Sequence, residues 1–360
     1  MGPQVRRRET VAPLDIDMTL RIWPSQKIRQ ALTQGAITSA LPVLNEQIQP
    51  ASLDLRLGDR AYRVPTSFLP GRGRSVARRL SELATHEVDL SRPQVLERDC
   101  VHIVPLQESV RLAPTTSARA NPKSSSGRLD IFVRLITDGG TAFDDIPPGY
   151  EGPLFAEVVP RSFPVIAGAG TTLNQIRFRE AVSHGAHPPD RTMSVSVNLE
   201  PASADGVVAY RARRTSGLVD LKRVGAYRRE DFWEPLSLHS KNSELVLVPD
   251  EFYIMASLED IRVEAHEAAE MVAYDTSVGE IRVHYAGFLD PGFGLPRLDG
   301  LGSKIVLEVR SHDVPFLLVH GQRVGTIAFE EMLEIPDILY GEDIKSNYQG
   351  QGLKLSKQFV

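Results

Sequence analysis

Two stretches of the chain, EVVPRSFPVIAGAGTTLNQIRF at residues 157–178 and EVRSHDVPFLLVHGQRVGTIAF at residues 308–329, align with each other without a gap. Both begin with a glutamate, Glu157 or Glu308, and a proline, a glycine, an isoleucine and a phenylalanine then fall in register. Self-similarity of this kind indicates a repeated structural unit. We therefore interpret the chain as two diverged copies of one fold.

Matches upstream of these stretches keep the same order. QPASLDLRLGDRAYRV from Gln49 aligns with EPASADGVVAYRAR from Glu200, and HIVPLQES from His102 aligns more weakly with VLVPDEFY. Polar and proline residues concentrate in SHGAHPPDRTMS, between the two copies, which is typical of a linker. The sequence thus predicts two domains, residues 1–190 and residues 191–360.

The apolar runs of the chain are short, rich in Val, Ile and Phe, and interrupted by turn-forming residues. Examples are LDIFVRLI, ELVLVPD and KIVLEVR, and the chain has 25 prolines and 27 glycines in all. Runs of four to eight such residues between turn formers are typical of β-strands. We expect a mainly β protein of antiparallel sandwich or barrel type with a few short helices, one of them at residues 25–32.

The overall composition narrows the class of protein. The chain has 360 residues, 42% of them apolar, a formal net charge of −5 and a single cysteine, Cys100. This charge does not favour nucleic acid or an anionic membrane as a partner. The N-terminus lacks an apolar stretch behind its basic residues, and no window approaches the roughly 20 apolar residues of a membrane span. We expect a cytoplasmic protein that binds neither nucleic acid nor a membrane.

Several catalytic motifs are missing from the sequence. Zinc-dependent nucleobase deaminases need a His-x-Glu and a Pro-Cys-x-x-Cys motif, which a chain with one cysteine cannot supply. The Gly-x-x-x-x-Gly-Lys-Ser/Thr phosphate loop is also missing. The expected chemistry therefore uses no zinc.

Two segments remain as candidates for chemistry. Lys123-Ser124-Ser125-Ser126-Gly127-Arg128 offers hydroxyls, a tight turn and two cations, which a polyphosphate requires. Glu157 lies among apolar residues in PLFAEVV, on an expected buried strand. Such a glutamate is either paired structurally or facing solvent, or it is a general base whose pKa burial has raised, and the residues alone leave these readings open.

Taken together, these motifs resemble the trimeric dCTP deaminase branch of the dUTPase superfamily. QPASLDLRLG resembles the opening motif of that family, and KSSSGRLDI its phosphate motif. PPGYEGPLFAE resembles a hairpin, normally Asp-Pro-Gly-aromatic-x-Gly, that ends eight residues after its first glycine in the glutamate taken as the catalytic base. Tyr340 and SNYQGQG resemble the C-terminal tail that folds over the nucleotide.

The resemblance implies two tandem dUTPase-like domains, each a distorted jelly roll or β-barrel. It also implies zinc-independent deamination of dCTP to dUTP and ammonia, at sites between the subunits of a homotrimer. Mg²⁺ would enter with the triphosphate and take no ligand from the protein. The tail from Tyr340 onward would be a lid, and we expect it to be mobile without ligand and dispensable for stability.

The resemblance also assigns roles to individual residues. Glu157 would take a proton from the attacking water, while Ser124 and Arg128 would orient that water or bind phosphate. The further nucleotide-binding residues would be Lys123, Ser125, Asp290, Tyr340, Lys345 and Gln351. Lys123 stands where the family has arginine, and Lys345 could substitute for the tail lysine that Asn347 replaces.

The two halves depart from the family pattern in complementary ways. In the first half Pro147 replaces the hairpin aspartate, whereas the second half keeps Asp290 and Glu308 with eight extra residues between them. Because its spacing is intact, we prefer Glu157 as the base. The rival arrangement pairs Ser124 and Arg128 with Asp290 and Glu308 across a contact between the halves.

Three functions remain open from the sequence. The first is deamination of dCTP. The second is hydrolysis of dUTP to dUMP and pyrophosphate, alone or combined with deamination, although Pro147 disfavours it in the first half. The third is a non-catalytic regulator that binds a nucleotide.

Overall fold

The computed structural model describes residues 18–183, 191–201, 205–238, 244–272, 281–284, 287–295, 302–311, 314–341 and 348–360. The described chain is mainly β, as the sequence predicts. Its helices are α1 (Ser25–Thr33), α2 (Val76–Leu83), α3 (Ser124–Gly127) and α4 (Arg229–Phe232), with a 3-10 turn at Asn45–Gln47. The helix expected at residues 25–32 is α1, which buries Ile28 and Ala31 against the first half. None of the helices in these ranges is long and apolar enough to cross a membrane.

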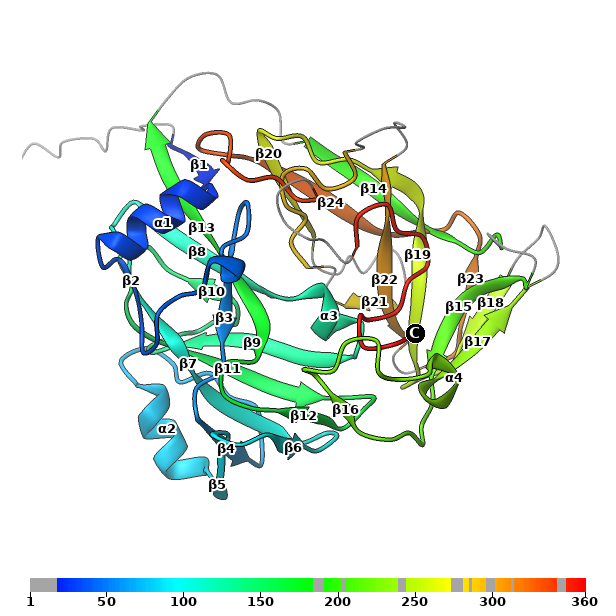
Figure 1. Cartoon of the computed structure of the whole chain (residues 1–360), viewed down its shortest axis with the longest axis horizontal. Coiled ribbons are helices and arrows are strands. Elements are labelled where there is room, and N and C mark those ends of the chain that lie inside the picture. Colours follow the sequence, from blue (N-terminus) through cyan, green and yellow to red (C-terminus); the bar gives the residue numbers. More distant parts are fainter. Residues whose placement is uncertain are drawn as a thin grey trace, which may run out of the picture.

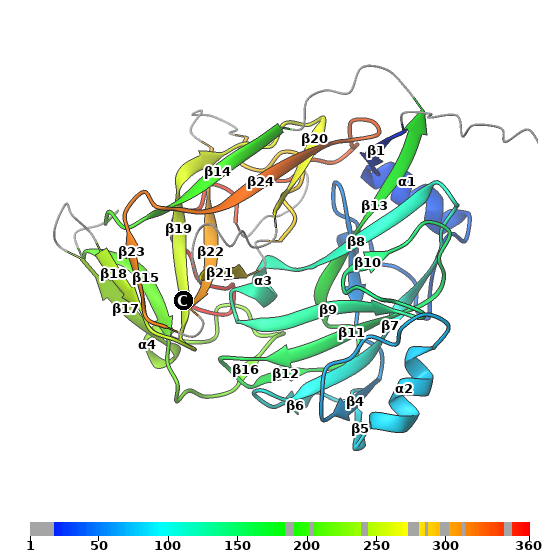
Figure 2. The same ribbon diagram turned by 180° about the vertical axis from the view of Figure 1, so that it is seen from behind.

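Two antiparallel sheets form most of the first half (Figures 1 and 2). One contains β1 (Met18–Ile22), β3 (Leu53–Arg56), β8 (Thr116–Pro122), β10 (Asp145–Ile146) and β13 (Thr172–Ser183). The other contains β2 (Ile37–Ser39), β4 (Arg60–Val64), β5 (His86–Asp89), β7 (Val101–Arg111), β9 (Ile131–Thr137) and β11 (Glu151–Pro160). Their apolar side chains meet in one core, which includes Leu55, Val104 and Phe178.

The second half is built around one large sheet. It contains β14 (Arg191–Asn198), β15 (Val207–Ala212), β17 (Trp233–Ser237), β19 (Phe252–Ile261), β20 (Glu267–Met271), β21 (Ile281–His284), β22 (Ser303–Ser311) and β24 (Arg323–Glu331). β18 (Glu244–Leu247) and β23 (Phe316–Val319) form a separate pair. This half has its own core, with Tyr253, Leu307 and Ile327 among its fully buried members.

The aligned glutamates lie on strands with matching neighbours. β11, which carries Glu157, lies between β7 and β9, and β22, which carries Glu308, lies between β19 and β21. All four contacts are antiparallel. The duplication inferred from the sequence stays an inference, and this correspondence supports it.

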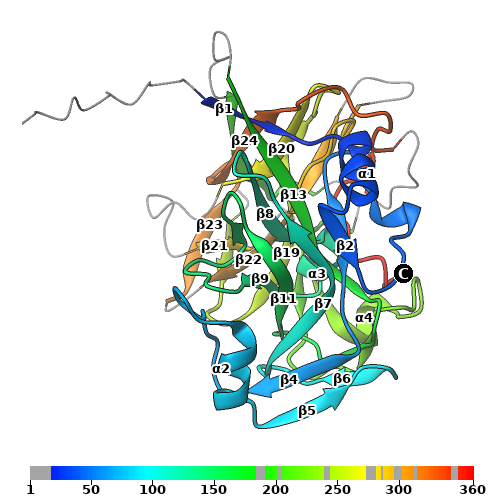
Figure 3. The ribbon, with the colours of Figure 1, turned by 90° about the vertical axis from the view of Figure 1, so that its left-hand side faces the viewer.

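The halves are joined by more than the linker. A third sheet places β6 (Gln94–Leu96) and β12 (Val165–Ala167) of the first half beside β16 (Val219–Asp220) of the second. The core of the first half also continues into the second through aromatic contacts, since the Phe163 ring lies 5.2 Å from that of Trp233. Short α3 lies where the two halves meet, with the C-terminal segment beside it (Figures 1 and 3). This junction positions the candidate site.

Candidate active site

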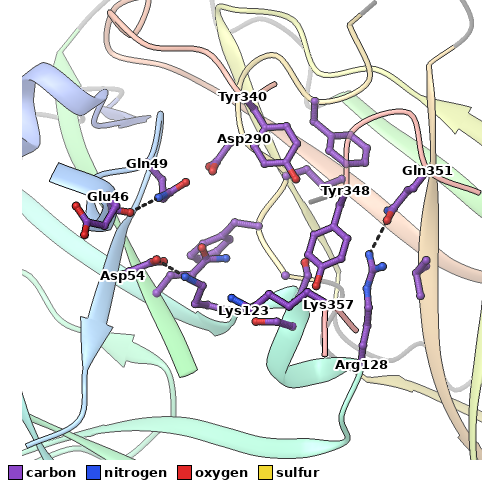
Figure 4. A pocket seen from close by; sticks show the side chains of 18 of the residues that line it. Glu46, Gln49, Asp54, Lys123, Arg128, Asp290, Tyr340, Tyr348, Gln351 and Lys357 are labelled. Atoms are coloured by element: carbon purple, nitrogen blue, oxygen red, sulfur yellow. Dashed lines mark hydrogen bonds and ion pairs between the residues drawn. The ribbon is translucent and has the colours of Figure 1, made fainter. Parts of the chain in front are cut away.

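A cavity of about 760 Å³ opens between the two halves. The first half contributes the segment from Lys123 to Arg128, and the second half contributes the hairpin that carries Asp290 and the strand that carries Glu308. Figure 4 shows Lys123, Arg128 and Asp290 around a common space, with Tyr348 and Gln351 of the C-terminal segment on one side. The lining residues named by the sequence analysis are Lys123, Ser124, Ser125, Arg128, Asp290, Glu308, Tyr340 and Gln351.

The phosphate-motif segment forms α3, a single helical turn between β8 and β9. The turn closes through hydrogen bonds from the Ser126 and Gly127 amides to the Lys123 carbonyl, at 2.8 and 3.0 Å. The Ser126 hydroxyl donates to the Leu173 carbonyl at 2.8 Å, so that side chain points into the protein. Ser124 and Ser125 face the cavity instead. The local fold thus presents two of the three serines to a ligand.

Arg128 is buried at the end of this turn and touches the C-terminal segment. Its guanidinium donates to Oε1 of Gln351 at 2.9 Å and to the Lys354 carbonyl at 3.0 Å. The ring of Tyr348 lies 3.9 Å from the guanidinium carbon, a cation–π distance. The described end of the tail is therefore folded over the cavity and contacts Arg128.

Glu308 extends from β22 into the interior of the cavity and is only 1% exposed. Burial raises its pKa well above the usual value, the nearby Asp130 carboxylate adds to the rise, and Arg128 opposes it. Oε2 has no hydrogen-bond partner among the described residues. A buried carboxyl with a raised pKa and an unpaired oxygen facing a cavity has the properties of a proton-transfer group.

The contact between Glu308 and Gly127 explains why a glycine is needed in the phosphate segment. A Cβ at position 127 would overlap the carboxylate of Glu308. Gly127 therefore allows the α3 turn and the buried carboxyl to lie in direct contact, although they come from opposite halves of the chain. The geometry of the site depends on this close approach.

Asp290 is held by an arginine that the sequence did not single out. Arg177 lies 3.2 Å from the Asp290 carboxylate, and it also donates to the carbonyls of Ala269 and Leu289. Burial raises the pKa of Asp290 to about 6, against the opposing effect of Arg177. The ring of Phe288, 4.0 Å from the guanidinium carbon, covers this pair. Asp290 is thus fixed at the edge of the cavity.

Asp54 is a second carboxylate that the sequence analysis did not assign to the site. It forms an ion pair with Lys123, and burial raises its pKa. Its Oδ1 atom is unpaired within the described part of the chain. Asp54 belongs to the quoted LDLRLG motif, so its position was visible in the sequence. Its partner was not, because β3 and α3 are brought together only by the fold.

The structure places Glu157, our preferred base, outside this cavity. The Glu157 side chain is 1% exposed and accepts hydrogen bonds from Nη2 and Nε of Arg134, at 2.6 and 3.1 Å. β11 lies between β7 and β9, so its glutamate faces an arginine on the neighbouring strand and not the phosphate segment. Within one chain, Ser124 and Arg128 share their cavity with Glu308, as in the rival arrangement.

The remaining predicted residues belong to the C-terminal tail. Tyr340 lines the cavity and packs on Phe293 with ring centroids 5.7 Å apart. Lys345 lies outside the described residues. The end of the tail differs from the dispensable lid that we expected, because Leu355 is buried and Phe359 packs against Phe232 at 5.3 Å. In the described ranges, no group of three or more His, Cys, Asp or Glu residues could hold a metal ion.

Comparison with known proteins places these features in a family. The model of the 2′-deoxycytidine 5′-triphosphate deaminase N-terminal domain matches residues 19–182, and that of the C-terminal domain matches residues 169–359. A solved structure of 2′-deoxycytidine 5′-triphosphate deaminase from Agrobacterium tumefaciens is 45% identical, with a TM-score of 0.83. That match covers 88% of this chain and 100% of the other.

Shorter relatives match about half of the chain. One from Methanosphaera stadtmanae, named dCTP deaminase, dUMP-forming, is 29% identical over 47% of this chain and 84% of its own length. Another with the same name, from Bifidobacterium animalis subsp. lactis, is 32% identical over 45% of this chain and 80% of its own length. A protein from Mannheimia succiniciproducens named dCTP deaminase is 26% identical over 46% of this chain and 86% of its own length.

Proposed function

Because this chain belongs to the 2′-deoxycytidine 5′-triphosphate deaminase family, we propose that it deaminates dCTP in the cavity between its two halves. One observation in this chain supports the location of the reaction. The buried carboxyl of Glu308, with an unpaired oxygen, lies against the turn that carries Ser124, Ser125 and Arg128. A proton-transfer group and a phosphate-binding segment therefore face the same space.

In this proposal, Glu308 acts as the general base and then as the general acid. Its carboxylate takes a proton from a water molecule whose oxygen attacks C4 of cytosine, forming a C4–O bond and a tetrahedral intermediate. The same proton is then delivered to the exocyclic amine, the C4–N bond breaks, and ammonia leaves. One water is consumed for each ammonia released. A carboxyl with a raised pKa suits both steps, because it can hold the proton between them.

The phosphates would bind at the end of the cavity formed by α3. Ser124 and Ser125 offer hydroxyl donors there, while Lys123 and Arg128 offer positive charge. The positive charge of Arg128 also opposes the rise in the pKa of Glu308, and so favours the carboxylate form that accepts the proton. In the same proposal, Tyr340 covers the nucleotide and Gln351 holds the tail on Arg128.

We further propose that Mg²⁺ accompanies the triphosphate and neutralises part of its charge. Asp54 fits this role as the carboxylate beside the cations, since its Oδ1 is unpaired within the described residues and could accept a hydrogen bond from the ion's hydration shell. No protein ligand to the ion is required.

A second activity is favoured by a separate observation. Asp290 lines the same cavity, and a carboxylate near the α-phosphate could hold the water that hydrolyses dUTP to dUMP and pyrophosphate. The relatives from M. stadtmanae and B. animalis are named dUMP-forming. The final product is therefore dUTP if deamination acts alone, and dUMP if Asp290 supports the second step.

The test is a product analysis with purified protein and dCTP. We expect one ammonia for each dCTP consumed, with Mg²⁺ supplied and a zinc-selective chelator present. Separation of the nucleotides and assay of pyrophosphate would distinguish dUTP from dUMP. In an enzyme that forms dUMP, Asp290→Asn should lower pyrophosphate release more than ammonia release. Failure to release ammonia from dCTP, or activity that zinc alone restores, would overturn the proposal.

A further inference from the structure

The last six residues, Leu355–Val360, form an arm that is fixed on both sides of Lys357. Before this lysine, the buried Ser356 donates from its hydroxyl to the Ser125 carbonyl at 2.9 Å. After it, the Gln358 side chain donates to the Leu221 carbonyl at 3.1 Å. The ring of Phe359 then enters an aromatic cluster, 5.8 Å from Trp233. The main chain of the arm is therefore held in place on both sides of Lys357 by contacts within the protein.

This arm carries the ammonium group of Lys357 into the candidate site. Lys357 lines the cavity together with Lys123 and Asp54 (Figure 4). Burial lowers the pKa of Lys357, the neighbouring Lys123 lowers it further, and Asp54 opposes both effects. A half-buried lysine beside a second lysine is electrostatically unfavourable unless negative charge compensates it.

The described protein supplies too little of that negative charge. The Asp54 carboxylate already pairs with Lys123. No hydrogen bond or ion pair to the Lys357 ammonium is formed by the residues that the structure describes. Asp290 is paired with Arg177, and burial favours the neutral acid form of Glu308. Glu46 also lines the cavity but lies beyond Asp54 from Lys357 (Figure 4), so positive charge is in excess at the end where Lys123 and Lys357 meet.

Lys357 also lines a second, smaller cavity of about 190 Å³ next to the first. Ser125 is common to both, and the smaller cavity adds the hydroxyls of Thr171 and Thr172. A polyphosphate that starts at Ser124 and Arg128 would meet Lys357 as it approaches this cavity. Hydroxyls and an ammonium group are suited to a terminal phosphate.

From these observations we infer that Lys357, to which the resemblance assigns no role, binds the terminal phosphate of the nucleotide. The inference rests on the proposed function, because it assigns one further contact in the same site. Lys357 is a binding residue in this scheme and takes no part in proton transfer. Its removal should therefore change affinity and leave the chemical step intact.

The test compares Lys357→Met with the unaltered enzyme. We expect KM for dCTP to rise about tenfold to a hundredfold, the usual effect of losing one charge-assisted contact, with kcat changed by less than about threefold. Binding of dCMP, measured by calorimetry, should be unchanged. Lys357→Arg should recover most of the affinity for dCTP because it keeps the charge.

A charge-matched control lies on the same tail. Lys354 is exposed and its side chain lines neither of the two cavities, so Lys354→Met should leave KM for dCTP within about twofold. If Lys357→Met has an effect as small as this control, or if dCMP and dCTP weaken equally, the inference is wrong while the deaminase proposal stands. If the unaltered enzyme binds dCTP but releases no ammonia, the proposed function fails, and the calorimetric comparison still decides the role of Lys357.

Discussion

The two glutamates on matching strands allow the proposed base to be separated from a structural ion pair by experiment. Glu308→Gln should lower kcat for dCTP deamination by roughly two to four orders of magnitude, the usual contribution of general acid–base catalysis. Glu157→Gln should leave kcat within about threefold, because Glu157 lies outside the cavity and faces Arg134. On stability we expect the reverse order: Glu157→Gln should lower the free energy of unfolding, and Glu308→Gln should not.

The expected stability changes follow from the partners of each carboxyl. Glu157 accepts two hydrogen bonds from Arg134, which is 26% exposed on its side chain, so water can partly replace a lost bond. Loss of the negative charge should therefore lower the free energy of unfolding by about 1–2 kcal/mol. Burial favours the neutral acid form of Glu308, and glutamine is a neutral side chain of the same shape. Glu308→Gln should leave the free energy of unfolding unchanged or raise it.

The assay pairs ammonia release with urea unfolding for both variants, and binding of dCTP to Glu308→Gln is measured by calorimetry. Retained binding with lost turnover would identify a chemical defect. The reasoning is refuted if Glu157→Gln abolishes turnover while Glu308→Gln does not. That outcome would return the base to Glu157 and require a neighbouring chain to bring it to a phosphate segment.

Three further predictions concern the same junction. Gly127→Ala should lower kcat by about a hundredfold while the protein stays folded, because the new Cβ displaces the Glu308 carboxylate; kinetics and circular dichroism would check this. The raised pKa of Glu308 means that the folded state holds its proton to higher pH than the unfolded state does. The free energy of unfolding of the natural protein should therefore fall, relative to that of Glu308→Gln, as pH rises above about 4.5. Urea titrations at several pH values would measure this difference. Deletion of residues 355–360 should lower the thermal midpoint, because Phe359 leaves its aromatic cluster; an unchanged midpoint in calorimetry would contradict that packing.

The sequence was sufficient for the type of fold and for naming many of the residues that line the candidate cavity. Short Val- and Ile-rich runs between turn formers become strands, and the KSSSGR segment, Asp290, Glu308, Tyr340 and Gln351 share one cavity. The choice between Glu157 and Glu308 could not be made in this way. Both lie on buried strands with corresponding neighbours, and the tertiary contacts distinguish them: Glu157 pairs with Arg134, whereas Glu308 lies against Gly127 in the cavity.

Residues that depend on tertiary contacts were missed for a related reason. Asp54 stands in a recognisable motif, but its importance depends on its ion pair with Lys123, 69 positions away. Lys357 gives no local signal at all, because its place in the cavity depends on how Phe359 is anchored. The tail was expected to be dispensable because its Gly- and polar-rich part was weighed without the packed arm at Leu355–Val360.

Because residues from both halves of one chain line the cavity, the arrangement has a genetic consequence. Arg128 and Glu308 come from opposite halves of one polypeptide, yet they serve one cavity. Two alleles that each lose one of these residues would therefore fail to complement each other when expressed together, since every chain carries one intact half and one defective half. If an enzyme instead completes its site between separate subunits, such a mixture recovers part of its activity by reassortment. Within a fused chain, the two halves are inherited and selected as one unit.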